Sequence, residues 1–186
     1  DIAGLDPTNR LLWRAQRKHL SIEQLRDSLL AVSGNLDRTM RGRAAPMWSD
    51  DYTKRRTIYG YINRFNLDPT LRIFDFPTPM QTQPGRDESI VAPQSLFIMN
   101  SRIVIDQSIA LTETPEFAAC ETDDARTTRL YFSVLQREPS PQEVVRIGKF
   151  VEQQARFFPA AKSKMKSPWP LVAQAVLMSN EFQYLD

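Results

Sequence analysis

The chain has 186 residues, of which 41% are hydrophobic and 25% charged, a balance typical of a globular protein that buries a core without a metal or disulfide. Its 24 basic and 22 acidic side chains give a formal net charge of +2, which is too even to indicate nucleic acid or a membrane surface as a partner. One cysteine, Cys120, and one histidine, His19, exclude a disulfide framework, a Cys-x-x-Cys-His haem attachment and an H-E-x-x-H zinc helix, so we expect no cofactor in this chain.

The start of the chain is unusual. It begins at Asp1, without methionine, and a helix signal follows almost at once. We expect this end to be cut or processed, so that the chain is the C-terminal part of a larger protein. No stretch approaches the roughly 18 apolar residues of a membrane span, and no signal peptide is recognisable, so no membrane-spanning segment is expected.

Residues 1–34 are predicted to be helical. A short helix is expected over Asn9 to Gln16. The run Ser21-Ile-Glu-Gln24 is a capping box, because the serine hydroxyl and the glutamine side chain can each satisfy a free backbone N–H at a helix start. Gly34 is suited to end that helix in a left-handed conformation. Its apolar stripe has helical spacing: Ile22, Leu25, Leu29 and Val32.

The middle of the chain, residues 35–91, is rich in proline and has few periodic runs. The β-branched and aromatic run Thr57–Ile62 predicts a short strand, with a helix as the alternative. Asp68-Pro69 matches an N-cap followed by proline at the first helical position, and predicts a short helix. Prolines keep the segment from Phe76 to Gly85 extended or turning.

Helical patterning returns from residue 92 to the end of the chain. Two helices are predicted over Pro93–Met99 and Ser101–Thr112. Three more are expected to begin at Asp123 or Asp124, at the capping box Ser140-Pro-Gln-Glu143 and at Ser167-Pro168, and to pack together. Their predicted stripes are Thr127, Leu130, Tyr131, Val134 and Leu135; Val144, Ile147, Val151, Ala155 and Phe158; and Trp169, Val172, Val176 and Ser179.

These signals predict one mainly α domain over residues 1–186. We expect an orthogonal helical bundle with a long proline-rich irregular middle segment and at most one short β element. Helices would fill residues 1–34, the irregular segment residues 35–91, and the bundle residues 92–186. Because a loop of that length is uncommon in a compact domain unless it is packed or functional, function is expected in the middle segment.

Several runs occur in an order that resembles a known family. The first half contains Asn9-Arg-Leu-Leu-Trp-Arg14, Leu25-Arg-Asp-Ser-Leu-Leu-Ala-Val-Ser-Gly34, and Arg55-Arg56 followed by Tyr59. The centre contains Phe74-Asp-Phe-Pro77 and Val91-Ala-Pro-Gln-Ser-Leu-Phe-Ile-Met-Asn-Ser101. Arg129-Leu-Tyr131, Arg137-Glu-Pro139 and Ser179-Asn-Glu-Phe182 close the series. Over nearly the whole chain, these runs resemble the planctomycete-type domain of unknown function 1553.

The resemblance implies a location and a set of neighbouring domains, and it implies no reaction. Domains of this type typically end large exported proteins that carry a second uncharacterised domain and often a cytochrome c module. A periplasmic or extracellular location is therefore expected, with other domains of the same polypeptide or partner subunits as neighbours. Any haem would lie in such a neighbouring domain, because this chain lacks the attachment motif.

The charged and aromatic residues of the middle segment are the strongest candidates for binding. Arginine side chains can bind carboxylate, sulfate or phosphate through two parallel hydrogen bonds, and tyrosines beside them can stack on sugars. The alternative is structural: Arg56 and Arg86 would pair with Asp75 and Glu88 and tie the loop to the helices. The candidate binding residues are Arg55, Arg56, Tyr59, Asp75, Arg86 and Trp48.

Catalytic patterns are weak in this sequence. Asp75, Asp87 and Glu88 are the loop carboxylates that could act as an acid pair in glycoside hydrolysis, but any chain with 22 acidic residues offers such candidates. His19 is interpreted as a surface or capping residue, and Cys120 as a half-buried residue at a helix end. No catalytic or metal-binding residue is therefore predicted.

Three functions remain open. The leading hypothesis is a non-catalytic structural or interaction module of an exported multidomain protein or assembly. The second is an accessory domain of a cytochrome c-type electron-transfer protein whose haem lies elsewhere. The third is a carbohydrate-binding or carbohydrate-active domain, with a polysaccharide as partner, using Arg56, Tyr59, Asp75 and Arg86.

Overall fold

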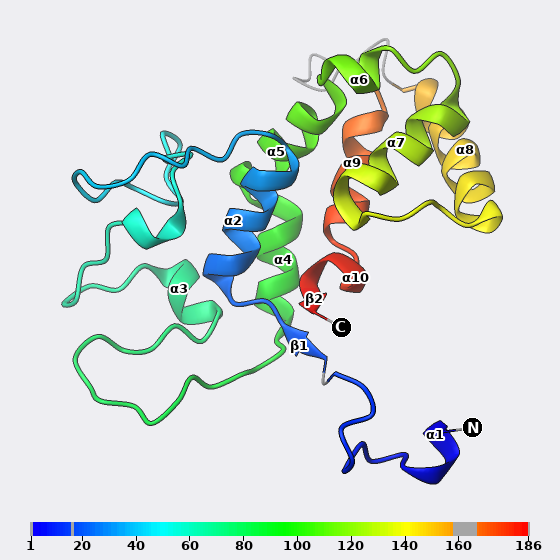
Figure 1. Ribbon diagram of the computed structural model, residues 1–186. Coiled ribbons are helices and arrows are strands. Elements are labelled where there is room, and N and C mark those ends of the chain that lie inside the picture. The colour runs from blue at the N-terminus through cyan, green and yellow to red at the C-terminus, as the bar shows by residue number, and fades with distance from the viewer. Residues whose placement is uncertain (1, 16, 158–166, 186) are drawn as a thin grey trace.

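The fold is mainly α, as the sequence predicts. The computed structural model describes residues 2–15, 17–157 and 167–185. The central helices are α2 (Ile22–Val32), α4 (Ala92–Asn100) and α5 (Arg102–Thr112). The irregular loops extend to one side of these helices and the C-terminal helices to the other, while the first residues project from the body as an arm (Figure 1).

Helix α2 begins and ends where the sequence predicts. The Ser21 hydroxyl accepts the backbone N–H of Gln24 at 3.3 Å, and the Gln24 side chain accepts the N–H of Ser21 at 3.0 Å. At the other end Gly34 has a φ of +72°, and the N–H of Asn35 donates to the Leu30 carbonyl at 2.8 Å. This is a Schellman ending, which glycine favours because it lacks a Cβ.

The helix predicted over Asn9 to Gln16 is wrong for the residues that the structure describes; Gln16 itself lies outside them. One helical turn, α1 (Ile2–Leu5), comes earlier, and the chain then makes consecutive turns. The Asp6 carboxylate accepts the N–H groups of Arg10 and Leu11 at 3.0 and 2.7 Å. The Asp6 carboxylate thus accepts the N–H groups that backbone carbonyls would accept in a helix, and this favours the turns over a helix.

The middle segment is irregular, as predicted, and contains the short helix expected after Asp68. This helix, α3 (Pro69–Ile73), has Asp68 as its N-cap, and the carboxylate accepts the N–H of Thr70 at 2.8 Å. The rest of residues 35–91 makes turns and bends apart from one turn of 3-10 helix.

The strand predicted over Thr57–Ile62 is wrong, and the helical alternative is confirmed only for its first three residues. Thr57–Tyr59 form the 3-10 turn η1, and Gly60 then makes an isolated parallel bridge with Ala45. Met47 approaches Gly60 so closely that a Cβ at position 60 would overlap its thioether. Glycine therefore permits two loop segments to pack together where a β-branched residue would hold them apart.

The described residues form one two-stranded sheet, and it joins the segment before α2 to the C-terminal residues. Strand β1 (Lys18–His19) pairs antiparallel with β2 (Tyr184–Leu185), and the N–H of Leu20 donates to the Gln183 carbonyl at 2.8 Å. The rings of His19 and Tyr184 meet edge to face, with centroids 4.9 Å apart. The pairing fixes the direction in which the N-terminal arm leaves the body.

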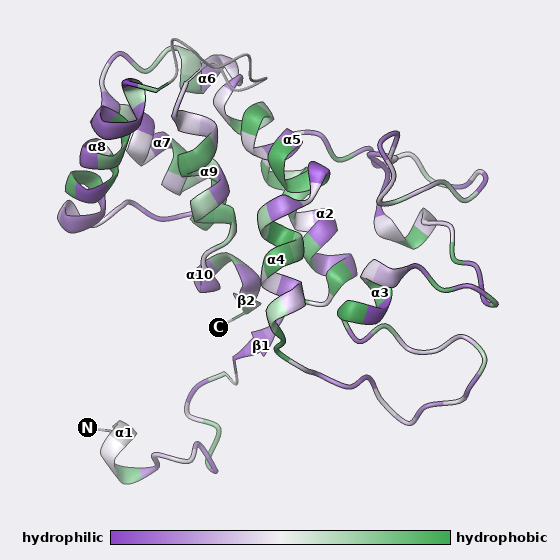
Figure 2. Ribbon diagram, turned by 180° about the vertical axis from the view of Figure 1, so that it is seen from behind, coloured by the Kyte–Doolittle hydropathy of each residue, from purple (hydrophilic) through white to green (hydrophobic). Residues whose placement is uncertain are grey.

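Helices α4 and α5 are confirmed, with the break at Ser101. Helix α5 packs along α9 (Trp169–Leu177), and hydrophobic residues are frequent in α4, α5 and α9 (Figure 2). Burying these residues is the main source of stability for such short helices. The most buried side chains of α5 and α9 include Val104, Leu111, Trp169, Ala173 and Leu177.

The C-terminal helices pack as predicted, with one correction at the end. Helices α7 (Asp123–Leu135), α8 (Pro141–Ala155) and α9 contact one another, and α6 (Pro115–Ala118) lies against α5 and α7. Ser179 does not continue the face of α9: it caps the extra turn α10 (Asn180–Gln183) by accepting the N–H of Phe182. Phe158, the last predicted stripe residue of α8, lies outside the described residues.

Within the described residues, none of the helices has the length and apolar composition needed to cross a bilayer.

Candidate functional site

Helix α2 holds the irregular middle segment through a buried arginine. The Arg26 side chain is 0% exposed. Its guanidinium donates to the Arg55 carbonyl at 2.9 Å and to the Thr57 hydroxyl at 3.1 Å, and also to the carbonyl of Thr53. Burial lowers the pKa of Arg26, and the neighbouring Asp27 carboxylate opposes that shift. Polar groups of the middle segment thus replace water around the buried Arg26 guanidinium, and the guanidinium holds them in place.

Asp27 is the second link between α2 and the middle segment. Its Oδ1 accepts the backbone N–H of Thr57 at 2.7 Å and the Thr57 hydroxyl at 2.6 Å. Its Oδ2 lies 3.7 Å from Nε of Arg56, whose side chain is 58% exposed. The hydrogen bonds to Thr57 therefore anchor the turn, while the exposed pair with Arg56 adds little.

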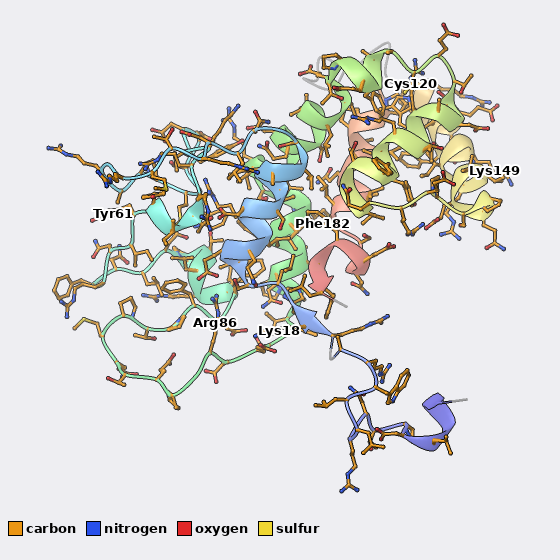
Figure 3. All side chains as sticks on the ribbon, viewed as in Figure 1. Lys18, Tyr61, Arg86, Cys120, Lys149 and Phe182 are labelled. Carbon is orange, nitrogen blue, oxygen red and sulfur yellow. The ribbon has the colours of Figure 1, made fainter. Side chains whose placement is uncertain are left out.

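Glu23, one helical turn before Asp27, is the third link. It binds Arg86 through both carboxylate oxygens, at 3.0 and 2.9 Å. The other terminal nitrogen of Arg86 donates to the Phe74 carbonyl at 2.9 Å, and its guanidinium lies 5.6 Å from the Phe76 ring centre. One arginine thereby joins α2 to two points of the loop (Figure 3).

The prediction that Arg56 and Arg86 pair with Asp75 and Glu88 is wrong. Arg56 and Arg86 pair with the α2 acids, as described above. Asp75 accepts the N–H and hydroxyl of Ser89, both at 2.7 Å, and Glu88 lies 3.5 Å from Lys18. The reason is helical spacing: Glu23 and Asp27, four residues apart, share one face of α2 and meet both loops. The predicted role, tying the loop to the helices, is confirmed by these contacts.

These contacts border two adjoining cavities on the face of α2, which we call the α2 groove. The larger, about 780 Å³, is bordered by four charged side chains, Glu23, Asp27, Arg56 and Arg86, and by apolar ones. The smaller, about 340 Å³, shares Leu20, Ser21, Gln24 and Arg86 with it. The apolar wall of the larger cavity consists of Leu20, Ile58, Ile62, Phe76 and Leu185.

The charge of the α2 groove is negative. Its lining contains five carboxylates and three cations, a formal charge of −2 with His19 neutral. The wall includes exposed apolar groups, since Ile58 is 77% and Leu185 51% exposed. A groove of this kind suits a ligand that combines apolar and basic groups.

The candidate binding residues do not form one site. Arg56 and Arg86 line the larger cavity, and Asp75 lines the smaller one. Arg55 instead stacks on the Tyr59 ring, 4.1 Å from its centre, and donates to the carbonyls of residues 39, 41 and 43. Arg55 and Tyr59 therefore fasten the loop over residues 39–43 and do not face the groove.

Trp48 packs inward rather than presenting an open face. Its ring lies edge to face with Phe97, with centroids 5.6 Å apart, and the Arg26 guanidinium lies 5.8 Å from its centre. It is half-buried against the core. The cation–π contact with Arg26 helps to offset the burial of that charge.

The key residues that sequence reasoning missed are Glu23, Arg26 and Asp27. Their signal was present: two acids four residues apart flank an arginine on a helix with an apolar stripe. Since Arg26 follows the buried Leu25, it falls at the edge of that stripe, where the guanidinium reaches the loop behind it. In the described part of the chain, no three His, Cys, Asp or Glu side chains are grouped so that they could hold a metal ion.

Comparison with known proteins identifies the family of this chain. No curated protein and no solved structure matches the chain. The family PSD1, described as a protein of unknown function (DUF1553), matches residues 1–151, which include the α2 groove except for Leu185. The run Ser179-Asn-Glu-Phe182 lies beyond the matched residues. Because the match covers most of its length, the chain belongs to the PSD1 (DUF1553) family.

Proposed function

We propose that this chain is a non-catalytic interaction module of an exported multidomain protein, and that the α2 groove binds a chain segment carrying apolar and basic side chains. The exported setting rests on the family resemblance alone. The observation that supports the binding role is the groove itself: apolar walls, a formal charge of −2 and a volume of about 780 Å³ in its larger part.

The engagement of the charged residues supports recognition rather than catalysis. Glu23 and Asp27 bind arginines and backbone groups, and Asp75 holds Ser89 in place. Carboxylates with fixed partners are poor candidates for proton transfer, because a general acid or base needs a free bond to the reacting group. The same partners keep the groove walls in position before a ligand arrives, which lowers the entropy cost of binding.

A saccharide is less well supported as the ligand. The sugar-binding hypothesis used Tyr59 as the stacking ring, and that ring is instead covered by Arg55. The apolar part of the groove consists of aliphatic side chains together with Phe76. Aliphatic groups suit leucine-like side chains better than the polar rim of a sugar.

Isothermal titration of the purified chain tests this proposal. The probe is a synthetic peptide of alternating leucine and arginine residues, compared with the same peptide carrying glutamate in place of arginine. The basic peptide should bind, and Ile62→Glu in the groove wall should weaken it by about tenfold or more, since a buried charge without a partner costs at least about 1.4 kcal/mol.

The matched control is Leu96→Glu on α4, a 57% exposed leucine that lines neither cavity and should leave binding unchanged. Sulfated and neutral polysaccharides are titrated in parallel. The proposal is overturned if neither peptide binds, or if a polysaccharide binds and Arg56→Ala or Asp75→Ala abolishes that binding.

A further inference from the structure

The N-terminal arm, residues 2–15, has its own hydrogen-bonded structure. Asp6 and Asn9 are only 8% and 7% exposed, although the arm projects from the body (Figure 1). The Trp13 indole N–H donates to the Asp6 carbonyl at 2.9 Å, and Asn9 exchanges two hydrogen bonds with the backbone of Arg14, at 2.8 and 3.2 Å. Each of these bonds joins two residues of the arm. The N–H groups of Leu11 and Arg10 also hold the pKa of Asp6 below its ordinary value.

This internal structure presents apolar side chains to solvent. Leu5 is 87% exposed, Leu11 84% and Leu12 73%, and Trp13 is 39% exposed beside them. Leu12 has a φ of +53°, a conformation that costs a residue with a Cβ free energy and persists only where neighbouring bonds impose it. Exposed leucines that a strained turn holds in place are typical of a binding site.

The arm and the α2 groove are complementary in chemistry. The arm carries two exposed cations, Arg10 and Arg14, around its leucines, and its one carboxylate, Asp6, is buried. The groove has an apolar wall and a formal charge of −2. Its larger cavity, in which two acids balance two arginines, offers apolar surface to the leucines. The excess of carboxylates lies in the smaller cavity, where Asp75, Asp87 and Glu88 outnumber Lys18 and Arg86 and suit the arginines of the arm.

The geometry directs the arm away from its own groove. Leu20 lines the groove, and the pairing of β1 with β2 just before it fixes the exit of the arm from the body. Eight residues lie between Leu11 and Leu20, so the two are at most about 30 Å apart even in an extended chain. A second groove lies within that limit if a two-fold axis passes close to the exit of the arm, and each arm then enters the groove of the other chain.

We propose that the occupant of the α2 groove is the N-terminal arm of a second copy of this chain, in a reciprocal dimer where Leu11, Leu12 and Trp13 of each copy pack on Ile58, Ile62 and Phe76 of the other. This inference rests on the proposed binding role of the groove and names its ligand. In such a two-fold dimer each chain contributes one arm and one groove, so the same contact occurs twice.

Sedimentation equilibrium of the whole chain over a range of concentrations tests the inference. Wild type should be a dimer. The arm variant Leu11→Glu/Leu12→Glu and the groove variant Ile58→Glu should each dissociate at least about tenfold more readily, because each places carboxylates in an apolar contact near other carboxylates. Leu96→Glu, an equivalent change of an exposed leucine outside both surfaces, should remain a dimer.

Mixing the two variants gives the decisive result. The arm variant retains an intact groove and the groove variant an intact arm, so the mixture should form a heterodimer through one remaining contact. A monomeric wild type, a heterodimer that fails to form, or equal effects of Leu96→Glu and the two variants would overturn the inference. If the basic leucine peptide still binds the groove in a monomeric wild type, the proposed function stands and only the second copy as ligand is wrong.

Discussion

A single buried cation, Arg26, links the sequence of α2 to the path of the middle segment. Its guanidinium has no exposed surface, and its donors are taken up by the Met47 carbonyl and by carbonyl and hydroxyl groups of residues 53–57. Asp27 beside it, 3.8 Å away, adds a counter-charge. Such an arrangement is stable only as a whole, because the removal of the cation leaves buried acceptors without donors.

We therefore expect Arg26→Met to lower the free energy of unfolding by about 3 kcal/mol, the cost of leaving several buried acceptors unpaired. Arg56→Met is the matched control: that side chain is 58% exposed and its ion pair is 3.7 Å long, so the change should cost less than about 1 kcal/mol. Urea unfolding of both variants measures the difference. Equal losses in the two variants would contradict the role of Arg26.

At the scale of elements, an arginine outside the helices joins α8 to α10. Arg137 binds both oxygens of Glu143 in the capping box of α8, at 3.0 and 2.9 Å. It also binds both oxygens of Glu181 in α10, at 2.6 and 2.7 Å. Its guanidinium lies 5.2 Å from the Tyr131 ring centre, so one side chain joins three helices. These bonds, with those from Ser140, lower the pKa of Glu143 to about 2.

The pKa of Glu143 predicts how α8 responds to acid. Because the folded-state pKa is below the ordinary value of 4.5, the carboxylate stabilises the fold fully above about pH 4.5, and this contribution is lost as the pH falls toward 2. Glu143→Gln keeps the capping box, since glutamine also fits that position, and removes the charge. The variant should be about 1 kcal/mol less stable than wild type at pH 7, a value reduced for solvent screening, and the gap should shrink at about pH 2.5.

Urea unfolding of wild type and Glu143→Gln at the two pH values measures that gap. Carboxylates that do not bind Arg137 contribute equally in both proteins, so the difference between them reports on the Arg137 pairs with Glu143 and Glu181. A gap that keeps its size in acid would show that the charge does not contribute through the pair with Arg137.

At the scale of the molecule, the residues beyond the family match complete the core. The match ends at residue 151, within α8, while α9 packs on α5 and β2 pairs with β1. The buried side chains contributed from beyond residue 151 include Trp169, Val172, Ala173, Val176, Leu177 and Phe182. The folded unit is thus larger than the part by which the family is recognised.

We expect a chain ending at residue 151 to lose cooperative unfolding, because α5 would expose the face that α9 covers. Removal of residues 1–15 is the control, since that arm makes its hydrogen bonds within itself and should leave the body folded. Near-ultraviolet circular dichroism during urea titration distinguishes the two. A cooperative transition in the chain that ends at residue 151 would show that residues 1–151 fold alone.

The predicted elements divide according to how local their signals are. The caps at Ser21, Asp68 and Ser140 were found because the residues that make them lie within a few positions of each other. The helix over Asn9 to Gln16 failed because the buried Asp6 gave the backbone a competing acceptor. The strand over Thr57–Ile62 failed because its partner segments are set by tertiary contacts with α2 and residue 45.

The sequence by itself determined the mainly α class, the starts of the longer helices, the irregular middle and the family, since each depends on neighbouring residues or on the order of short runs. It also found three residues of the groove, Arg56, Asp75 and Arg86. Only the tertiary structure decided their partners, turned Arg55, Tyr59 and Trp48 away from the groove, and paired the two ends of the chain. Charges and β-bridges act between residues distant in sequence, and their pairing depends on which helix faces are brought together when the core is buried.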